Sequence, residues 1–379
     1  MKQFFRDLSK NLYRYIAKPI FFKLSPDFAH SFMIKVSKVL QYIPGINWLI
    51  HTLIVDNKNT KDNKVDIEQK LAGVTYKGPV GLTAGFDKNL ETVGMMKAVG
   101  FSFMEGGTIT YKPYKGNPKP WFYRLPNSKS LVVNAGLANQ GAPKILARLS
   151  KIKNKWHQDF PINISVGKTN CKENANEDCG INDYISTLKL LKNHLYVDAI
   201  TLNISCPNVK HGGIQFGTDP NIARNLTEKV KAVSSVPVYV KLSPNVTDIV
   251  AMAKAVEAGG ADGLTMINTL VGIVLDRKTG KPIIANTTGG LSGPAIKPVA
   301  IRMVYQVAQA VNIPIIGMGG VMDEWDVIDF ISAGASAVAV GTANFTDPFV
   351  CPKIIDNLES ALDELGVNHI LDLKGRAFK

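Results

Sequence analysis

Short apolar runs rich in β-branched residues alternate with longer segments of helical pattern from about residue 79 to the end of the chain. In 248–258, 298–311 and 325–333, apolar side chains recur every three or four positions, as on one face of a helix. This alternation is typical of βα units around a parallel sheet. The eight expected strands span residues 79–83, 101–106, 162–166, 199–204, 237–242, 263–267, 314–317 and 337–341, and a closing helix is expected at 352–365.

Eight alternations favour a closed barrel over an open doubly wound sheet. An open sheet of the dinucleotide-binding type usually has fewer repeats and a GxGxxG turn after its first strand, and no such turn occurs here. We therefore expect the α/β class and a (β/α)8 TIM barrel with an N-terminal helical extension. Two insertions, 121–134 and 273–284, are expected to form short hairpins at the end of the barrel where barrel enzymes keep their chemistry.

Residues 1–70 have a different pattern and are expected to form a separate extension and linker, with the barrel domain at 71–379. Apolar side chains from Phe5 to Ile16 recur at helical spacing, and a second helix is expected at 26–40. Residues 1–40 hold eight Lys and Arg against two Asp. This predicts a basic amphipathic hairpin suited to an anionic bilayer surface. The alternative is a helical cap that packs on the barrel.

Composition limits the classes of function. The chain has 379 residues, of which 45% are hydrophobic, enough for a large folded core. Its net charge of +13 is compatible with nucleic acid, an anionic membrane or an acidic substrate, but we recognise no RNA-binding module. We also find neither a secretory signal nor a run of about 18 apolar residues. The four cysteines include no CxxC pair, so we expect reduced thiols and no metal site.

Glycines follow the last two expected strands, in Gly317-Met318-Gly319-Gly320 and Gly341-Thr342. Glycine lets backbone N–H groups approach a phosphate closely, and barrels often bind phosphate at these two loops. A third glycine-rich segment, Gly289-Gly290-Leu291-Ser292-Gly293, precedes a helix. The pattern predicts a phosphate site, although glycines at barrel turns can also be purely steric.

Carboxamides, a thiol and lysines gather at the ends of other strands. The fourth strand ends in Asn203-Ile204-Ser205-Cys206-Pro207-Asn208, and Asn134 and Asn268-Thr269 follow other strands. Such side chains suit a planar ligand with alternating carbonyl and N–H edges, whereas a lone Asn is usually a turn residue. Lys241 lies within an apolar strand, and Lys88 follows the first. A buried lysine is costly unless an anion compensates it, which indicates an anionic ligand.

At these residues the sequence resembles the dihydroorotate dehydrogenases over nearly the whole chain. The resemblance implies FMN-dependent oxidation of dihydroorotate to orotate in UMP biosynthesis, with Cys206 as the base that removes a proton and FMN as the acceptor of a hydride. It implies substrate contacts from Lys88, Asn134, Asn203, Asn208, Asn268 and Thr269. It implies FMN contacts from Ala84, Gly85, Thr108, Ser165, Asn203, Lys241, Ile267, Gly293, Gly319, Gly320, Gly341 and Thr342.

The resemblance is to two classes of the family. The front part, with Ser25-Pro26-Asp27-Phe28-Ala29-His30, is similar to the membrane-associated, quinone-reducing class 2, and the back part, with a cysteine base, is similar to the NAD-linked class 1. We expect a quinone as acceptor, a peripheral location on the cytoplasmic side of the cell membrane and a homodimer as one possible assembly. The alternatives are an NAD-linked catalytic subunit with a flavin and iron–sulfur partner, a cytoplasmic location, a flavin barrel acting on tRNA uridine, and a barrel that only binds a phosphorylated ligand.

Overall fold

The eight expected strands form a closed parallel barrel. The computed structural model describes residues 2–55, 67–205 and 216–379, with the side chains of 2–6 left undescribed. Each barrel strand pairs with the next barrel strand along the chain, and the last pairs with the first, which confirms the predicted (β/α)8 fold. The barrel strands are β3 (Val80–Leu82), β4 (Phe103–Ile109), β7 (Ile162–Val166), β8 (Ala199–Asn203), β9 (Val238–Lys241), β10 (Gly263–Met266), β13 (Ile315–Met318) and β14 (Ala337–Val340).

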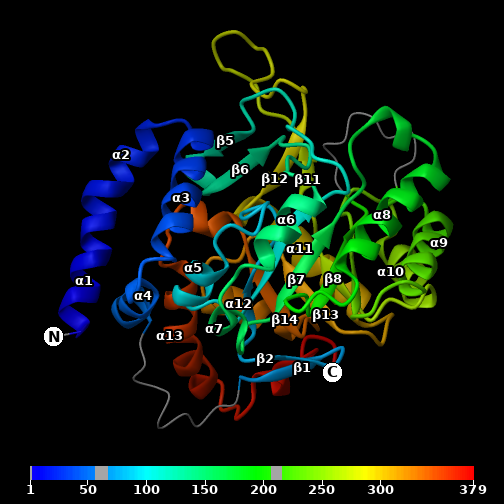
Figure 1. Cartoon of the computed structure of the whole chain (residues 1–379). Coiled ribbons are helices and arrows are strands. Elements are labelled where there is room, and N and C mark those ends of the chain that lie inside the picture. Colours follow the sequence, from blue (N-terminus) through cyan, green and yellow to red (C-terminus); the bar gives the residue numbers. More distant parts are fainter. Residues whose placement is uncertain (1, 56–66, 206–215) are drawn as a thin grey trace.

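Helices surround the barrel and bury their apolar faces against it (Figure 1). Several begin at an acidic side chain that accepts hydrogen bonds from the first-turn N–H groups, as Asp219, Asp248 and Asp323 do. Apolar positions on the inner faces of these helices then meet the outer faces of the strands. The helices are α5 (Val93–Ala98), α6 (Ala142–Leu149), α7 (Asn154–His157), α8 (Glu177–Leu191), α9 (Pro220–Lys231), α10 (Ile249–Ala258), α11 (Lys297–Ala308), α12 (Glu324–Ser332) and α13 (Val350–Glu364).

The two insertions lie at the carboxyl ends of the barrel strands, as expected. They contribute to an antiparallel sheet in the order β11 (Leu270–Gly272), β12 (Gly289–Ser292), β6 (Ser130–Val133) and β5 (Phe122–Leu125). The first insertion is the predicted hairpin of β5 and β6. The second also turns back on itself as predicted, with an antiparallel bridge between Leu275 and Pro282 and backbone hydrogen bonds on either side of it. Its longer paired strands, β11 and β12, flank 273–284. At the other end of the barrel, β1 (Gln69–Leu71) and β2 (Val74–Tyr76) form a hairpin whose Tyr76 is buried.

The N-terminal extension is helical, as predicted. It contains α1 (Lys2–Leu12), a short π-helix (Tyr13–Ala17), α2 (Lys18–Lys23), α3 (Pro26–Leu40) and α4 (Ile46–Ile54). Figure 1 shows α1 and α2 along one side of the molecule and α3 between them and β5. The buried Asp27 fixes α3 by accepting hydrogen bonds from the N–H groups of Trp121 and Phe122. Arg124 donates to the carbonyl oxygens of Phe21, Phe22 and Leu24, so the extension packs on the barrel mouth.

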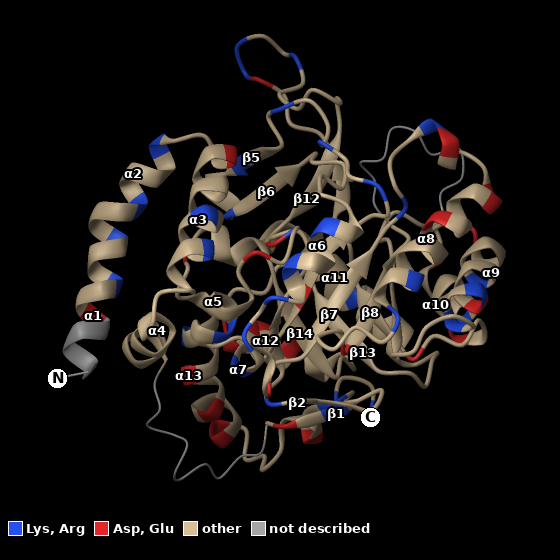
Figure 2. Cartoon of the chain, viewed as in Figure 1, with Lys and Arg blue, Asp and Glu red and all other residues tan. Residues whose placement is uncertain are grey.

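Apolar side chains remain exposed on the same extension. Leu8, Leu12, Ile16 and Ile20 follow one another at four-residue spacing, and each is at least half exposed. Figure 2 shows basic residues distributed along α1 to α3. No helix in the described part of the chain is both long enough and apolar enough to cross a bilayer.

Candidate active site

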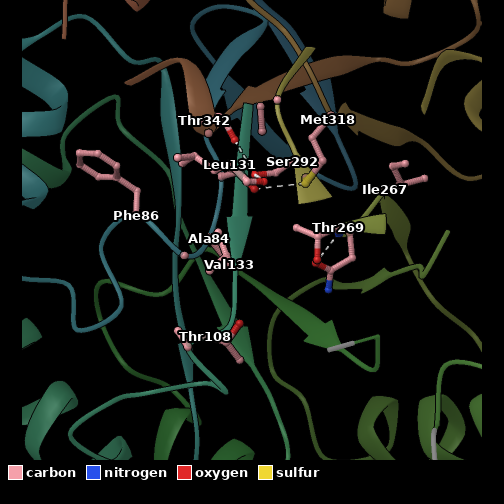
Figure 3. Close-up of a pocket in the computed structure, with 18 of the residues that line it drawn as sticks. Ala84, Phe86, Thr108, Leu131, Val133, Ile267, Thr269, Ser292, Met318 and Thr342 are labelled. Carbon is pink, nitrogen blue, oxygen red and sulfur yellow. Dashed lines mark hydrogen bonds between the residues drawn. The ribbon is translucent and has the colours of Figure 1, made fainter. Parts of the chain in front are cut away.

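One pocket opens at the carboxyl ends of the barrel strands, beneath the antiparallel sheet. Its walls come from segments far apart in the sequence, and Figure 3 shows Ala84, Thr108, Ile267, Met318 and Thr342 around one space. The predicted residues that line it are Ala84, Gly85, Lys88, Thr108, Asn203, Lys241, Ile267, Asn268, Thr269, Gly293, Gly319, Gly320, Gly341 and Thr342. The structure therefore brings together nearly all the described residues that the sequence predicts.

The glycine-rich segments meet at one side of this pocket. Gly319 and Gly320 have φ values of 124° and 94°, which residues with a Cβ rarely adopt. A Cβ at Gly320 would lie 2.7 Å from Cβ of Lys297, at the first turn of α11. Nearby, the Thr342 hydroxyl donates to Oγ of Ser292 at 2.9 Å (Figure 3). Close-packed glycines beside hydroxyl groups and the start of a helix fit a phosphate group.

A carboxamide network lines the adjoining wall. Nδ2 of Asn203 donates to Oγ1 of Thr108 at 2.8 Å, and Nδ2 of Asn268 donates to Oγ of Ser205 at 2.7 Å and to Oδ1 of Asn203 at 3.3 Å. These bonds fix the orientation of both carboxamides before any ligand binds. Ser165 is buried behind this wall, with its hydroxyl 2.8 Å from that of Thr108, and does not line the pocket. A direct contact of Ser165 with the cofactor therefore has no support from the pocket lining.

Asn134 is also outside the pocket lining. The residue is fully buried at the end of β6, where its Oδ1 accepts a hydrogen bond from Nδ2 of Asn117 at 2.8 Å. Its Nδ2 has no hydrogen-bond partner among the described residues. A buried N–H group without a partner is costly, so Nδ2 of Asn134 retains two N–H donors, one of which a ligand carbonyl could satisfy. Cys206 and Asn208 fall outside the described residues, immediately after Ser205.

Lys88 lies at the edge of the pocket, partly exposed. Its Nζ donates to the carbonyl oxygen of Gly85 at 2.7 Å and lies 5.2 Å from the ring centroid of Phe122. Desolvation lowers the pKa of Lys88 from 10.5 to about 8, although the negative charges of Asp87 and Asp27 oppose the shift. An amine with this pKa is mostly charged at neutral pH and would gain from pairing with a carboxylate.

The rings of Phe86, Phe122 and Phe345 line the mouth of the same pocket, and His30 of α3 packs against them without lining it. His30 packs between Phe86, Phe122 and Phe345, with ring centroids 5.2, 5.5 and 5.0 Å away. Burial, with a smaller effect of the Lys88 charge, lowers the pKa of His30 to about 3, so this imidazole is neutral at physiological pH. The mouth is therefore apolar, and the sequence analysis identified none of these four residues as part of the site.

Glu105 is a further residue that the sequence analysis missed. It lies in β4, buried, and its carboxylate is 3.3 Å from Nζ of Lys241. Lys241 also donates to Oγ1 of Thr83 at 3.3 Å. The signal for Glu105 was available, because a single carboxylate in the run Phe101–Gly106 is as unusual as a single lysine in β9.

A family model described as dihydroorotate dehydrogenase matches residues 66–362. The chain belongs to the dihydroorotate dehydrogenase family. Its cofactor is accordingly FMN, as expected, and the glycine cradle and the fixed carboxamides fit that group. Neither a tRNA-modifying barrel nor a non-catalytic barrel is favoured by this match.

The curated relatives are named as catalytic subunits. The chain is 74% identical over 265 residues to "Dihydroorotate dehydrogenase B (NAD(+)), catalytic subunit" of Fusobacterium nucleatum, covering 70% of this chain and 82% of that protein. It is 54% identical to a protein of the same name from Malacoplasma penetrans, over 84% of this chain and 99% of the relative. A Bacillus cereus protein of that name is 51% identical, over 84% of this chain and 98% of the relative.

Among solved structures, the chain is similar to a crystal structure of Eimeria tenella DHODH in complex with ferulenol. The TM-score is 0.76 at 26% sequence identity, covering 93% of this chain and 96% of the other. This superposition covers more of the chain than the 84% aligned with the Malacoplasma relative. It therefore includes part of the N-terminal extension, whereas the family match begins at residue 66.

These relatives favour NAD, the alternative acceptor, over the expected quinone. A quinone was expected ahead of NAD because the N-terminal extension resembles class 2, but the relatives are named as NAD-linked proteins. Neither the class 2 assignment nor the expected membrane location has support from them. The expectation gave the helical extension more weight than the barrel residues, where the cysteine base already indicated class 1.

Proposed function

We propose that this chain is the catalytic subunit of an NAD-linked dihydroorotate dehydrogenase. The supporting observation is its 74% identity over 265 residues to a relative of that name. The word "subunit" in that name supports a partner chain, and we propose one that carries a flavin and an iron–sulfur cluster. In this proposal dihydroorotate loses one proton and one hydride, and the two electrons leave through the partner to NAD.

The pocket supports a division of roles among its residues. The phosphate of FMN would lie at the cradle of Gly293, Gly319, Gly320 and Gly341 with Thr342, and Lys241 would face the ring system. When bound, FMN supplies the hydride acceptor. Ala84, Gly85, Thr108 and Ile267 would form the walls on either side.

The substrate would occupy the space between this cradle and the aromatic mouth. Lys88 would pair with the substrate carboxylate, because it is the lysine beside the mouth and its amine is poorly solvated. Asn203, Asn268, Thr269 and Asn208 would bind the alternating donors and acceptors of the ring, and Asn134, although outside the pocket lining, would offer its unpartnered Nδ2 group. Cys206 would remove the proton from the carbon next to the ring carbonyl, as a general base.

A second candidate function, quinone reduction, is favoured by one feature of the structure. The mouth lined by Phe86, Phe122 and Phe345 is apolar, and His30 packs against it from the N-terminal extension, whose α1 and α2 carry exposed apolar side chains. A lipophilic acceptor could approach by this route from a bilayer surface. The NAD-linked proposal stays ahead because it agrees with the names of the relatives.

The acceptor experiment distinguishes the two candidates. The FMN-loaded protein is reduced with dihydroorotate in the absence of oxygen and mixed with a short-chain quinone, with NAD, or with NAD and a flavin and iron–sulfur partner subunit from a related bacterium. The proposal predicts rapid reoxidation only in the last mixture. Rapid reoxidation by the quinone alone, at a rate that the partner does not increase, would replace it with the second candidate.

A further inference from the structure

A buried carboxylate lies directly beneath the pocket without lining it. Glu105 is in β4 and Lys241 in β9, and β7 and β8 separate these two strands in the barrel. Side chains of non-adjacent barrel strands can meet only across the barrel interior. The 3.3 Å contact between Oε1 of Glu105 and Nζ of Lys241 therefore lies inside the barrel, where the two side chains are 3% and 6% exposed.

The two charges are arranged in order of depth. Lys241 lines the pocket, Glu105 does not, and the Thr83 hydroxyl accepts from the same Nζ at 3.3 Å. The Thr83 hydroxyl in turn donates to the sulfur of Met318 at 3.1 Å, so it is held in place. A ligand in the pocket therefore meets the ammonium group first, with the carboxylate behind it.

We propose that Glu105 is a positioning residue that sets the electron affinity of bound FMN through Lys241. Reduction places negative charge on the flavin, which a nearby ammonium group stabilises. The carboxylate of Glu105 offsets part of that stabilisation from behind and holds the ammonium group toward the pocket. The balance would keep reduced FMN able to pass its electrons on. The proposal rests on FMN occupying this pocket and is independent of the identity of the acceptor.

The substitution Glu105→Gln tests the charge while keeping the shape. Glutamine is nearly isosteric with glutamate, and its carbonyl oxygen can still accept a hydrogen bond from Lys241. A unit charge acting through the protein interior over about 10 Å changes an equilibrium by roughly tenfold. We therefore expect the equilibrium constant for reduction of bound FMN to rise about tenfold in E105Q. The measurement is an anaerobic titration of the FMN-loaded protein against a dye of known potential, followed by visible absorbance.

Two further variants separate charge from structure. Glu105→Asp keeps the charge but moves it farther from Lys241, because the side chain is shorter. The midpoint potential of FMN in E105D should therefore lie between those of the parent protein and E105Q. Asp262→Asn is the matched control, because Asp262 accepts from Lys231 at 2.6 Å and from the N–H of Val238 at the opposite end of β9. This control removes the carboxylate from the pair of Asp262 and Lys231, which lies at the start of β9 and away from the pocket, and should leave the midpoint potential at the parent value.

The outcome is decisive in either direction. The proposal is supported if the midpoint potential of bound FMN becomes more positive from the parent to E105D and from E105D to E105Q. Slower reoxidation of E105Q by its acceptor also supports it. If E105Q retains FMN and its midpoint potential equals that of the parent protein, the proposal is overturned. A carboxylate with only a structural role would affect stability and leave the potential unchanged. If E105Q does not retain FMN, the decision falls to E105D, where an unshifted midpoint overturns the proposal.

Discussion

Replacing Lys88 by methionine should stabilise the protein and weaken its substrate binding at the same time. The pKa of Lys88 is about 8 in place of 10.5, and one pKa unit corresponds to about 1.4 kcal/mol, so keeping this amine charged at neutral pH costs the fold about 3 kcal/mol. Methionine avoids that cost but loses the hydrogen bond to the Gly85 carbonyl, worth about 1 kcal/mol. We expect K88M to raise the free energy of unfolding by about 1–2 kcal/mol at pH 7.

The sign of the pH dependence follows from the same pKa. Because folding lowers the pKa of Lys88, the folded state is penalised where the amine is charged, and the penalty is relieved as the pH rises from about 8 toward 10.5. The stability advantage of K88M should therefore shrink over that interval. Substrate binding should be weaker in K88M even though the fold is more stable, because the charged amine pairs with the substrate carboxylate. We expect the Kd for orotate to rise at least tenfold in K88M at pH 7, about 1.4 kcal/mol or more.

The assay combines two measurements on FMN-loaded protein. Chemical unfolding without orotate gives the stability, and the change in the flavin spectrum on adding orotate gives the Kd. Lys70→Met is the control, since Lys70 is exposed on β1 at the opposite end of the barrel, and it should alter neither quantity. An unchanged orotate Kd in K88M would refute the assignment of Lys88 to the substrate carboxylate. A loss of stability larger than about 1 kcal/mol would instead refute the desolvation cost assigned to its buried ammonium group.

Three further predictions test other parts of the account. Cys206→Ala should lower the rate constant for FMN reduction by dihydroorotate about a hundredfold to ten-thousandfold in stopped-flow experiments, and a parent rate would remove Cys206 as the base. Gly320→Ala should weaken FMN binding at least tenfold, about 1.4 kcal/mol, because its Cβ would meet Lys297 at a φ of 94°, and full retention of FMN after gel filtration would contradict the phosphate cradle. Deleting residues 1–24 should leave the rate of FMN reduction unchanged, since α3 stays fixed through Asp27, and a large fall would show that α1 and α2 act in the first half-reaction.

The barrel and most of the pocket were predictable because their signals are local. Each strand is a short apolar run, and residues at the carboxyl ends of parallel strands must converge in a closed barrel. Lys241 stood out by the same logic, as a charge in an apolar strand. Glu105 has the same signature in β4 but was overlooked, because the search for an anionic ligand considered only cations.

Other features depend on tertiary contacts that no local pattern encodes. At the aromatic mouth, Phe86, Phe122 and Phe345 come together with His30 from four distant segments. In the sequence, each of these residues on its own resembles an ordinary core residue. Asn134 was expected at the substrate, yet it ends a strand of the antiparallel sheet and one side of its carboxamide is taken by Asn117. In the proposed function the electrons reach their acceptor through a partner chain, so the acceptor depends on chemistry outside this sequence.

The most direct test of the central claim is an anaerobic titration of the FMN-loaded protein with dihydroorotate. The account predicts bleaching of the flavin absorbance with one equivalent of dihydroorotate per FMN and the release of orotate. It also predicts that the same titration fails at low dihydroorotate concentration in K88M but succeeds in the Lys70→Met control. A flavin that stays oxidised under excess dihydroorotate in the parent protein would contradict the claim that this pocket oxidises dihydroorotate.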